Sequence, residues 1–361
     1  MHTPTDRSGP FGLVFALLTA LLIAACSSGG SGTDPIAGDP TNPGDPGKPG
    51  DPADPIGEVE PGTPTAKTVT VDGEERSFVI YAPSSADNKA RKLAGLPAVI
   101  VFHGTTQNSD TPFSDTGGAN QEWLEIAEEE GVVLVAPNGS NLVTGSADGD
   151  IQTWNNCGSS PISGQSDDIA FVEAILDALV AAGIDSQRIY TTGGSNGGKF
   201  SYRVAIELST RIAGIAAFSA TLEVGAECGS PEQPVPTMIV NGTMDPVLIA
   251  SQLSGAITPQ TGTAETVEYW IQANGASPTP VEAGDLPDTN PDDGSTITRM
   301  RYEGGADSAP VLWYQVNGGG HYIPSQDHDF ATASVFIPVF GRQNRDVEGA
   351  REAWAFFASL P

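Results

Sequence analysis

Two patterns of apolar and polar positions alternate along the chain. Short continuous apolar runs, such as Ala98–Phe102 and Val132–Ala136, are typical of buried strands. The segment Asp168–Ala182 instead repeats its apolar residues on one helical face, and Ser166 or Asp167 can cap its start. The chain therefore predicts buried strands separated by amphipathic helices.

The same alternation continues to the end of the chain. The turn pair Asp72-Gly73 lies between two runs that suit a hairpin, Lys67–Val71 and Ser77–Tyr81. Further strands are predicted at Arg188–Thr192, Ile212–Phe218, Pro236–Val240, Thr296–Tyr302 and Val311–Val316, and helices around Trp123–Glu130 and at Lys199–Leu208, Glu265–Ala273 and Val347–Phe357. Such alternation requires a mostly parallel sheet with helices on both faces, so the pattern predicts one doubly wound α/β domain.

The N-terminal 66 residues do not follow this pattern. Phe11–Ala25 is an uncharged apolar stretch, too short for a comfortable transmembrane helix, and it ends in two small residues before Cys26. This resembles the lipobox of bacterial lipoproteins, which implies a signal peptide over residues 1–25 and lipidation of Cys26. An ordinary secretory peptide cut near Ala25 is the alternative.

Residues 26–66 have the composition of a tether. From residue 27 onward they hold nine prolines and seven acids, with few large apolar side chains to bury. Such a segment is expected to stay disordered and extended, which leaves residues 67–361 as the folded domain. Export and lipidation would anchor that domain to the bacterial cell envelope, and export alone would secrete it.

The net charge of the chain limits the kinds of molecule that it can bind. The chain has 45 acidic and 16 basic residues, a formal net charge of −29. Phosphate backbones and anionic membrane surfaces are repelled by such a protein. We therefore expect no nucleic-acid partner, and contact with a membrane only through the lipid anchor.

The candidate chemistry begins at Gly193-Gly194-Ser195-Asn196-Gly197-Gly198. A G-x-S-x-G pattern alone is a weak signal, but here it follows a predicted strand and precedes a helix-compatible run, as a nucleophile elbow does. The flanking glycines permit a sharp turn that leaves the serine hydroxyl exposed at a helix N-terminus. Ser195 is the predicted nucleophile, and a glycine-rich turn with an incidental serine is the alternative.

A serine nucleophile needs a base, and the chain has four histidines. His2 lies in the signal segment, and His103 at a strand end is expected to be structural, with its ring bonded to backbone. His321 follows the last predicted strand and a glycine stretch that is expected to give a flexible approach. His328 lies seven residues farther on between acids and is expected to be more exposed. His321 is the predicted base, with His328 as the alternative.

The third catalytic group should be a carboxylate that accepts the imidazole N–H. Asp245 lies just past the predicted strand Pro236–Val240 and is the predicted orienting acid. Asp285 and Asp288 are the alternatives, but they lie in a loop rich in Pro, Gly and Asp, where solvated turn residues are expected.

The residues around this triad are predicted less directly. An oxyanion hole needs two N–H donors, and we expect the backbones of Asn196 and of Thr105, in the loop after Ala98–Phe102. Trp154 either walls a substrate groove or packs beneath its loop. Residues 246–263 form either part of a lid or a plain surface loop.

These motifs together resemble a known family. They are His103-Gly104, Trp154 with Cys157 and Asp167-Asp168, Thr192 to Gly198, Asn241-Gly242-Thr243-Met244-Asp245, and Gly318-Gly319-Gly320-His321. In this order they look like the secreted polyhydroxybutyrate depolymerase and feruloyl esterase family of α/β-hydrolases, over residues 67–360. The resemblance implies ester hydrolysis through an acyl-enzyme. The chain departs from the family at Asn241, where His is usual, and after Gly104, where a Cys or Gly-rich continuation is common.

The resemblance implies an extracytoplasmic serine esterase. Feruloyl or acetyl esters of polysaccharide and short hydroxyalkanoate oligomers or polyesters are both compatible substrates. A secreted serine peptidase of the same fold is one alternative, and a non-catalytic polysaccharide-binding lipoprotein is another. The presence of Ser195, Asp245 and His321 favours catalysis.

Two cysteines remain once Cys26 is lipidated. In an exported protein, Cys157 and Cys228 predict a disulfide that closes a long loop, and two free thiols are the alternative. Two cysteines and few histidines do not supply the usual zinc ligands. We therefore predict no metal and no cofactor.

Overall fold

A ten-stranded β-sheet forms the centre of the fold. The computed structural model describes residues 56–86, 93–115, 117–147, 151–158, 164–223, 228–254, 262–328 and 337–361. The chain divides between residues 49 and 50, and the described residues all belong to the second unit. The strands of the sheet are, in chain order, β1 (Thr65–Val71), β2 (Glu74–Tyr81), β3 (Ala98–Phe102), β4 (Val133–Pro137), β7 (Ile189–Gly194), β8 (Gly214–Phe218), β9 (Thr237–Gly242), β10 (Glu282–Asp285), β11 (Thr296–Tyr302) and β12 (Val311–Asn317). A separate small hairpin consists of β5 (Ser140–Asn141) and β6 (Gln152–Thr153).

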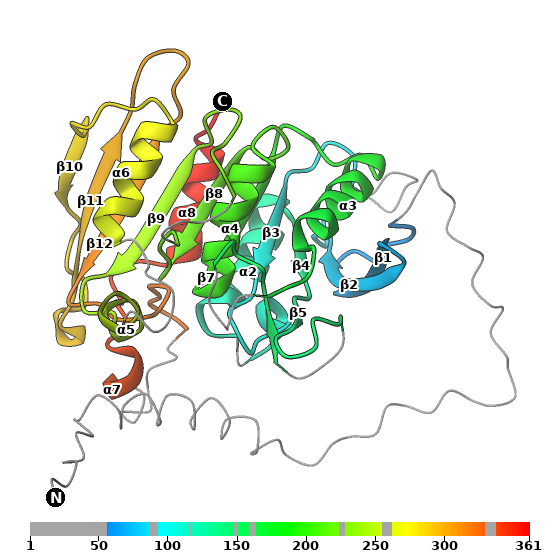
Figure 1. Cartoon of the computed structure of the whole chain (residues 1–361), viewed down its shortest axis with the longest axis horizontal. Coiled ribbons are helices and arrows are strands. Elements are labelled where there is room, and N and C mark those ends of the chain that lie inside the picture. Colours follow the sequence, from blue (N-terminus) through cyan, green and yellow to red (C-terminus); the bar gives the residue numbers. More distant parts are fainter. Residues whose placement is uncertain are drawn as a thin grey trace, which may run out of the picture. The chain divides into compact units, whose positions relative to one another are not determined.

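The middle of the sheet is parallel and its two margins are antiparallel. The spatial order is β1-β2-β4-β3-β7-β8-β9-β12-β11-β10 (Figure 1). The six strands from β4 to β12 in this order run parallel to one another, whereas β2 and β11 at the two margins pair antiparallel with both of their neighbours. Parallel neighbours need crossover connections, and helices make those from β3 to β4, from β4 to β7 and from β7 to β8. This arrangement confirms the predicted doubly wound α/β sheet.

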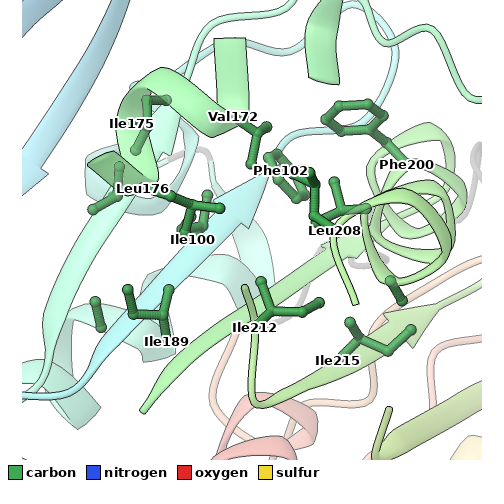
Figure 2. Packing of buried hydrophobic residues seen from close by; sticks show 14 of the residues in the cluster. Ile100, Phe102, Val172, Ile175, Leu176, Ile189, Phe200, Leu208, Ile212 and Ile215 are labelled. Atoms are coloured by element: carbon green, nitrogen blue, oxygen red, sulfur yellow. The ribbon is translucent and has the colours of Figure 1, made fainter. Parts of the chain in front are cut away.

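Helices cover both faces of the sheet. They are α2 (Glu122–Glu130), α3 (Asp168–Ala181), α4 (Asn196–Glu207), α5 (Pro246–Ser254), α6 (Thr263–Ala273), α7 (Ile337–Phe340) and α8 (Gly349–Ala358), with short 3₁₀ turns at Thr111–Phe113, Gly118–Gln121 and Pro291–Asp293. Because strand residues alternate between faces, Ile100 points to the apolar layer of α3, α4 and α6, while Val99 points to that of α2 and α8. Figure 2 shows the first layer, in which Phe102 lies between Val172 of α3 and Phe200 of α4.

The folded domain begins earlier than the sequence predicts. Ile56 and Val59 are each only 2% exposed and belong to the same apolar layer as α3 and α4. The strand β1 already starts at Thr65. Residues 56–66 therefore belong to the domain, because two apolar side chains anchor a segment that is otherwise largely exposed. The predicted signal peptide, Cys26 and the tether up to residue 55 lie outside the described residues.

Two segments predicted as loops hold regular structure. Helix α5 begins directly after Asp245, inside the segment 246–263 that the sequence predicts to be part of a lid or a surface loop. Residues 255–261 lie outside the described residues. Asp285 ends the exposed edge strand β10 and accepts a hydrogen bond from Thr298 Oγ1 at 2.6 Å. Within the described part of the chain, no helix is both long and apolar enough to cross a membrane.

Candidate active site

The predicted site residues follow three parallel strands. β7 leads into Ser195, β9 leads toward Asp245, and β12 leads toward His321. The pairing β7-β8-β9-β12 is parallel throughout, so the carboxyl ends of these strands lie on one edge of the sheet. In open α/β sheets, ligands bind outside that edge. The fold therefore places the three residues along one edge of the sheet, although 126 positions separate the first from the last.

Ser195 lies in a strained turn between β7 and α4. Its backbone has φ 55° and ψ −120°, a conformation that costs a non-glycine residue about 1–3 kcal/mol. A Cβ atom on Gly193 or Gly197 would collide with the carbonyl oxygen of Phe102 in β3. These glycines let the turn approach the neighbouring strand, and the turn leaves the serine at the N-terminus of α4.

Asp245 and His321 form a hydrogen-bonded pair. His321 Nδ1 donates to Asp245 Oδ2 at 2.7 Å, and the side chains are 10% and 1% exposed, respectively. Asp245 Oδ1 accepts the backbone N–H groups of Val247 (2.9 Å) and Leu248 (3.0 Å) in the first turn of α5. The carboxylate is thus held by a helix N-terminus, and Nε2 is the ring nitrogen that stays available for proton transfer.

The glycines before His321 are tightly packed, which corrects the expectation of a flexible approach. Gly320 N–H donates to Arg342 O at 2.7 Å, and His321 N–H donates to Phe340 O at 2.6 Å. A Cβ atom on Gly320 would overlap Phe340 O, and the Phe340 ring stacks beside the imidazole with centroids 6.3 Å apart. The glycines therefore serve close backbone approach and fix the histidine.

His103 has a structural role, as expected. Its Nε2 accepts the N–H of Gly139 at 2.9 Å, and its Nδ1 donates to Gly104 O at 2.8 Å. Both ring nitrogens are used by backbone, and burial lowers the pKa of His103 to about 4. The ring stays neutral and holds the start of the loop after β3.

The loop after β3 carries the predicted oxyanion donor Thr105. The N–H of Gly104 donates to Gln107 Oε1 (2.8 Å), and that of Thr106 donates to Gln152 O (2.9 Å). Among the hydrogen bonds of the described residues, none uses the N–H of Thr105. Thr105 is half-buried and lies three positions past the end of β3, the strand beside β7.

Trp154 packs beneath its loop, the second of the two expectations, and does not wall a groove. Its side chain is fully buried, and Nε1 donates to His103 O at 2.9 Å. The ring stacks on Phe200 with centroids 4.9 Å apart and contacts Phe102 edge-on. A flat apolar ring in a polar loop is attracted to this aromatic layer more strongly than to solvent.

Comparison with known proteins adds to this geometry. The family described as phospholipase/carboxylesterase matches residues 89–260. NocK, a candidate esterase of Nocardia uniformis subsp. tsuyamanensis, is 28% identical over 347 residues, which cover 92% of this chain and 93% of NocK. Feruloyl esterase C of Emericella nidulans is 25% identical over 204 residues, which cover 54% of this chain and 65% of that protein.

This chain is an ester hydrolase of the α/β-hydrolase fold. The predicted resemblance to feruloyl esterases is confirmed by these relatives. The solved structure of an acetyl xylan esterase from Aspergillus awamori is also similar to this chain. The TM-score is 0.46 and the identity 15%, over 71% of this chain and 94% of the acetyl xylan esterase.

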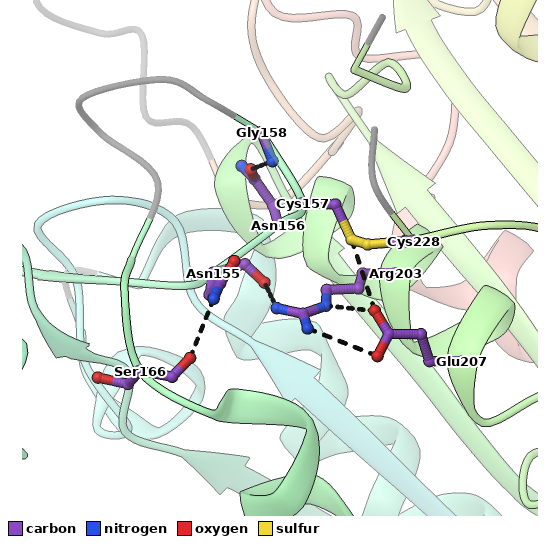
Figure 3. Close-up of a disulfide and its surroundings, with 8 residues drawn as sticks. All are labelled: Asn155, Asn156, Cys157, Gly158, Ser166, Arg203, Glu207 and Cys228. Carbon is purple, nitrogen blue, oxygen red and sulfur yellow. Dashed lines mark hydrogen bonds and ion pairs between the residues drawn. A yellow bond between two sulfur atoms is a disulfide. The ribbon is translucent and has the colours of Figure 1, made fainter. Parts of the chain in front are cut away.

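The predicted disulfide of the esterase is present (Figure 3). It joins Cys157 to Cys228, with their Cα atoms 5.9 Å apart and 71 positions between them in sequence. Arg203 of α4 holds the same loop, because its Nη1 donates to Asn155 O at 2.7 Å while its Nε contacts Glu207. The loop over the aromatic layer is therefore fixed both covalently and by charge.

The esterase also contains buried ion pairs that the sequence did not predict. Lys199, one turn after Ser195, contacts Glu223 at 2.7 Å, and burial lowers the pKa of the lysine. Arg76 contacts Asp168 at 2.8 Å, and burial raises the pKa of that carboxyl. The signal that the sequence offered was Lys199 itself, a charged residue between Gly198 and Phe200.

His328 belongs to a different ion-pair cluster. Its Nε2 lies 3.3 Å from Glu122 Oε2, and its side chain is 19% exposed, so it is less exposed than expected. Arg351 of α8 contacts the buried Glu122 and also Glu125 and Glu129 of α2. Burial is the main reason that the pKa of Glu122 is raised.

Two groups among the described residues have the types of side chain that bind metals. Cys157 and Cys228 lie near Glu207, but a disulfide removes the thiolates that a metal would need. Glu122, Glu125 and His328 form the second group, where the guanidinium of Arg351 already supplies the positive charge. We assign no cation site to either group.

Proposed function

We propose that Ser195, His321 and Asp245 form the catalytic triad of the esterase. The observation that carries the proposal is the 2.7 Å bond from His321 Nδ1 to Asp245, on the sheet edge where Ser195 is held in a strained elbow. Asp245 fixes the tautomer and stabilises the imidazolium that forms. The backbone N–H groups of Asn196 and Thr105 are the proposed oxyanion donors.

The reaction proceeds through two proton transfers at each stage. Ser195 Oγ adds to the ester carbonyl carbon while its proton passes to His321 Nε2, and the carbonyl electron pair moves onto the oxygen. Collapse of this intermediate breaks the bond to the alcohol, which takes the proton from His321. Water then adds to the acyl-serine in the same way, which releases the carboxylic acid and restores Ser195.

For the substrate we propose feruloyl or acetyl esters of polysaccharide, with short hydroxyalkanoate oligomers or polyesters as the second class. The similarity to a protein named feruloyl esterase C supports the first class. The polyester class rests on the resemblance of the motifs around Ser195, Asp245 and His321. The same machinery serves each ester, so the acyl preference must be measured.

We also propose that the esterase is exported and anchored. A signal peptide over residues 1–25 would be removed, Cys26 would carry the lipid, and the segment up to residue 55 would tether the domain. The disulfide supports an oxidising compartment, because such bonds are rare in reducing cytoplasm. Labelling with a radioactive fatty acid, lost in a Cys26→Ala variant, tests the anchor.

The test of the catalytic proposal uses soluble protein from residue 50 onward, which keeps Ile56 and Val59 in the core. Turnover of p-nitrophenyl acetate, p-nitrophenyl butyrate and methyl ferulate is compared with that of Ser195→Ala. We expect Ser195→Ala to lower turnover by about 10⁴-fold or more. The ratio of ferulate to butyrate rates then distinguishes the two substrate classes.

Other outcomes would contradict the proposal. Retained turnover in a folded Ser195→Ala variant would exclude this serine as the nucleophile. Folded wild-type protein without ester turnover and without serine labelling by a fluorophosphonate would favour the polysaccharide-binding lipoprotein. Faster cleavage of a peptide p-nitroanilide than of any ester would favour the peptidase.

A further inference from the structure

We infer that the carboxamide of Asn196 is a positioning group for the oxyanion hole. This role is distinct from the backbone N–H of the same residue, which is a proposed donor. The carboxamide would fix the loop that carries the second donor, Thr105. The inference rests on the proposed function, and it specifies what keeps the two proposed oxyanion donors, the N–H groups of Asn196 and Thr105, in position relative to each other.

The Asn196 side chain binds the segment 152–154. Asn196 is 3% exposed, and its Oδ1 accepts the N–H of Trp154 at 2.7 Å and the hydroxyl of Thr153 at 3.2 Å. Its Nδ2 approaches Trp154 O at 3.4 Å. The first residue after the nucleophile is therefore bonded to a segment more than 40 positions away in sequence.

That segment in turn holds the oxyanion loop at two points. Gln152 O accepts the N–H of Thr106 at 2.9 Å, and Trp154 Nε1 donates to His103 O at 2.9 Å. These bonds lie on either side of Thr105. Through the segment 152–154, the Asn196 carboxamide is therefore connected to His103 and to Thr106, which flank Thr105 at two and one positions.

The internal bonds of the loop leave one N–H for the oxyanion. Gly104 donates to Gln107 Oε1 and Gln107 N–H donates back to Gly104 O at 3.2 Å, while Thr106 adopts a positive φ of 72°. Within the described residues, the N–H of Thr105 has no such bond. The N–H of Asn196 opens helix α4, where backbone donors lack helical partners.

The consequence of losing this connection is kinetic. Removal of one oxyanion donor typically lowers kcat by 10²–10³-fold, and a displacement of about 1 Å has an effect of about 10²-fold. Asn196→Ala removes the carboxamide but keeps both backbone donors. We expect kcat to fall by about 10–100-fold while KM changes by less than about 2-fold, because the oxyanion exists only after attack.

The matched control is Asn241→Ala. Asn241 is also a buried asparagine at the carboxyl edge, 2% exposed. Its Oδ1 accepts the N–H of Ala220 at 2.9 Å, and its Nδ2 donates to Ala220 O at 2.8 Å and to Thr263 Oγ1 at 3.2 Å. Among the described residues, none of its side-chain hydrogen bonds reaches the loop after β3. A general loss of packing would affect both variants, whereas an oxyanion role affects only Asn196→Ala.

The experiment measures kcat and KM for p-nitrophenyl butyrate and inhibition by phenylboronic acid, whose adduct with serine places an oxygen where the oxyanion forms. We expect Asn196→Ala to lose inhibitor affinity and kcat in similar proportion and Asn241→Ala to stay within about 3-fold of wild type. If Asn196→Ala does not fold, the isosteric Thr153→Val removes one bond to the carboxamide and should lower kcat by about 2–5-fold.

Equal effects of Asn196→Ala and Asn241→Ala on kcat and on inhibition would overturn the inference. If Thr153→Val is measured instead, an unchanged kcat would overturn it. Ser195→Ala in the same assay keeps the two questions apart. If Ser195→Ala stays active, the proposed function fails. If it is inactive and the two asparagine variants behave alike, only the positioning role fails.

Discussion

Two histidines seven positions apart each lie beside a buried carboxylate, yet their surroundings differ. His321 uses Nδ1 to bind Asp245 at 2.7 Å, and the other carboxylate oxygen is bound by two backbone N–H groups of α5. His328 uses Nε2 to approach Glu122 at 3.3 Å, and Glu122 is shared with the guanidinium of Arg351. In the first pair, and among the described residues, the histidine is the one side chain that donates to its carboxylate.

This difference shows that proximity to a carboxylate does not by itself make a base. The Nδ1 bond orients the His321 ring and leaves Nε2 to face a substrate. His328 instead belongs to the cluster in which Glu122 of α2 meets Arg351 of α8. Its backbone is also held, since its N–H donates to Ser325 Oγ (2.9 Å) and its carbonyl accepts from Gln343 Nε2 (3.1 Å). We interpret His321 as catalytic and His328 as structural.

The strongest test of the comparison exchanges each histidine for glutamine. His321→Gln should lower kcat by about 10⁴–10⁶-fold, because no group remains to take the Ser195 proton. His328→Gln should stay within about 3-fold of wild type. Turnover of p-nitrophenyl butyrate by both folded variants decides, and comparable losses would show that the two sites are not distinct.

The carboxylates provide the second test. Asp245→Asn should lower kcat by about 10⁴-fold, because an amide in place of the carboxylate favours the wrong imidazole tautomer. Glu122→Gln should leave kcat within about 3-fold and lower the midpoint of thermal unfolding slightly, since Arg351 keeps Glu125 and Glu129. A larger kinetic effect of Glu122→Gln than of Asp245→Asn would reverse our assignment.

His103 extends the comparison of His321 with His328, because both of its ring nitrogens form hydrogen bonds to backbone groups. Burial depresses its pKa to about 4 from the ordinary value of 6.5. Between these values the unfolded chain binds a proton that the folded protein does not, so stability decreases as pH falls from about 6.5 to about 4. This linkage amounts to at most about 3 kcal/mol.

The variant His103→Gln tests this linkage. Its amide cannot titrate but can still accept the N–H of Gly139, so its unfolding free energy should fall less between pH 7 and pH 4.5 than that of wild type. Urea unfolding at both values measures the difference. Other buried carboxyls, such as Asp168 and Glu122, titrate in both proteins and cancel. Identical slopes would mean that His103 is not held neutral.

Much of the sheet was predictable because apolar periodicity is a local property. The strand Ala98–Phe102 and the helix from Asp168 have the predicted starts, and Asp167 caps that helix by accepting the Ala170 N–H at 3.0 Å. The exposed edge strand β10 was missed, since none of its residues is buried and no apolar alternation marks it. Helix α5 was missed because a capping aspartate and a proline also suit a loop.

The site was predictable to the extent that chain order and strand ends determine it. Residue types and the positions of strands placed Ser195, Asp245 and His321 on one edge. The burial of Trp154 was not predictable, because its partners His103 and Phe200 lie about 50 positions away on either side. The ion pair of Arg76 with Asp168 spans 92 positions, and no local pattern reports such a partner.

The disulfide makes the nucleophile part of a closed covalent ring. Residues between Cys157 and Cys228 include α3, β7, Ser195, α4 and β8, whereas Asp245 and His321 lie outside the ring. A protease that cuts once within this ring therefore releases no fragment. The nicked esterase would migrate as one chain on a non-reducing gel and as two after reduction, and its serine would remain tethered to the rest of the site.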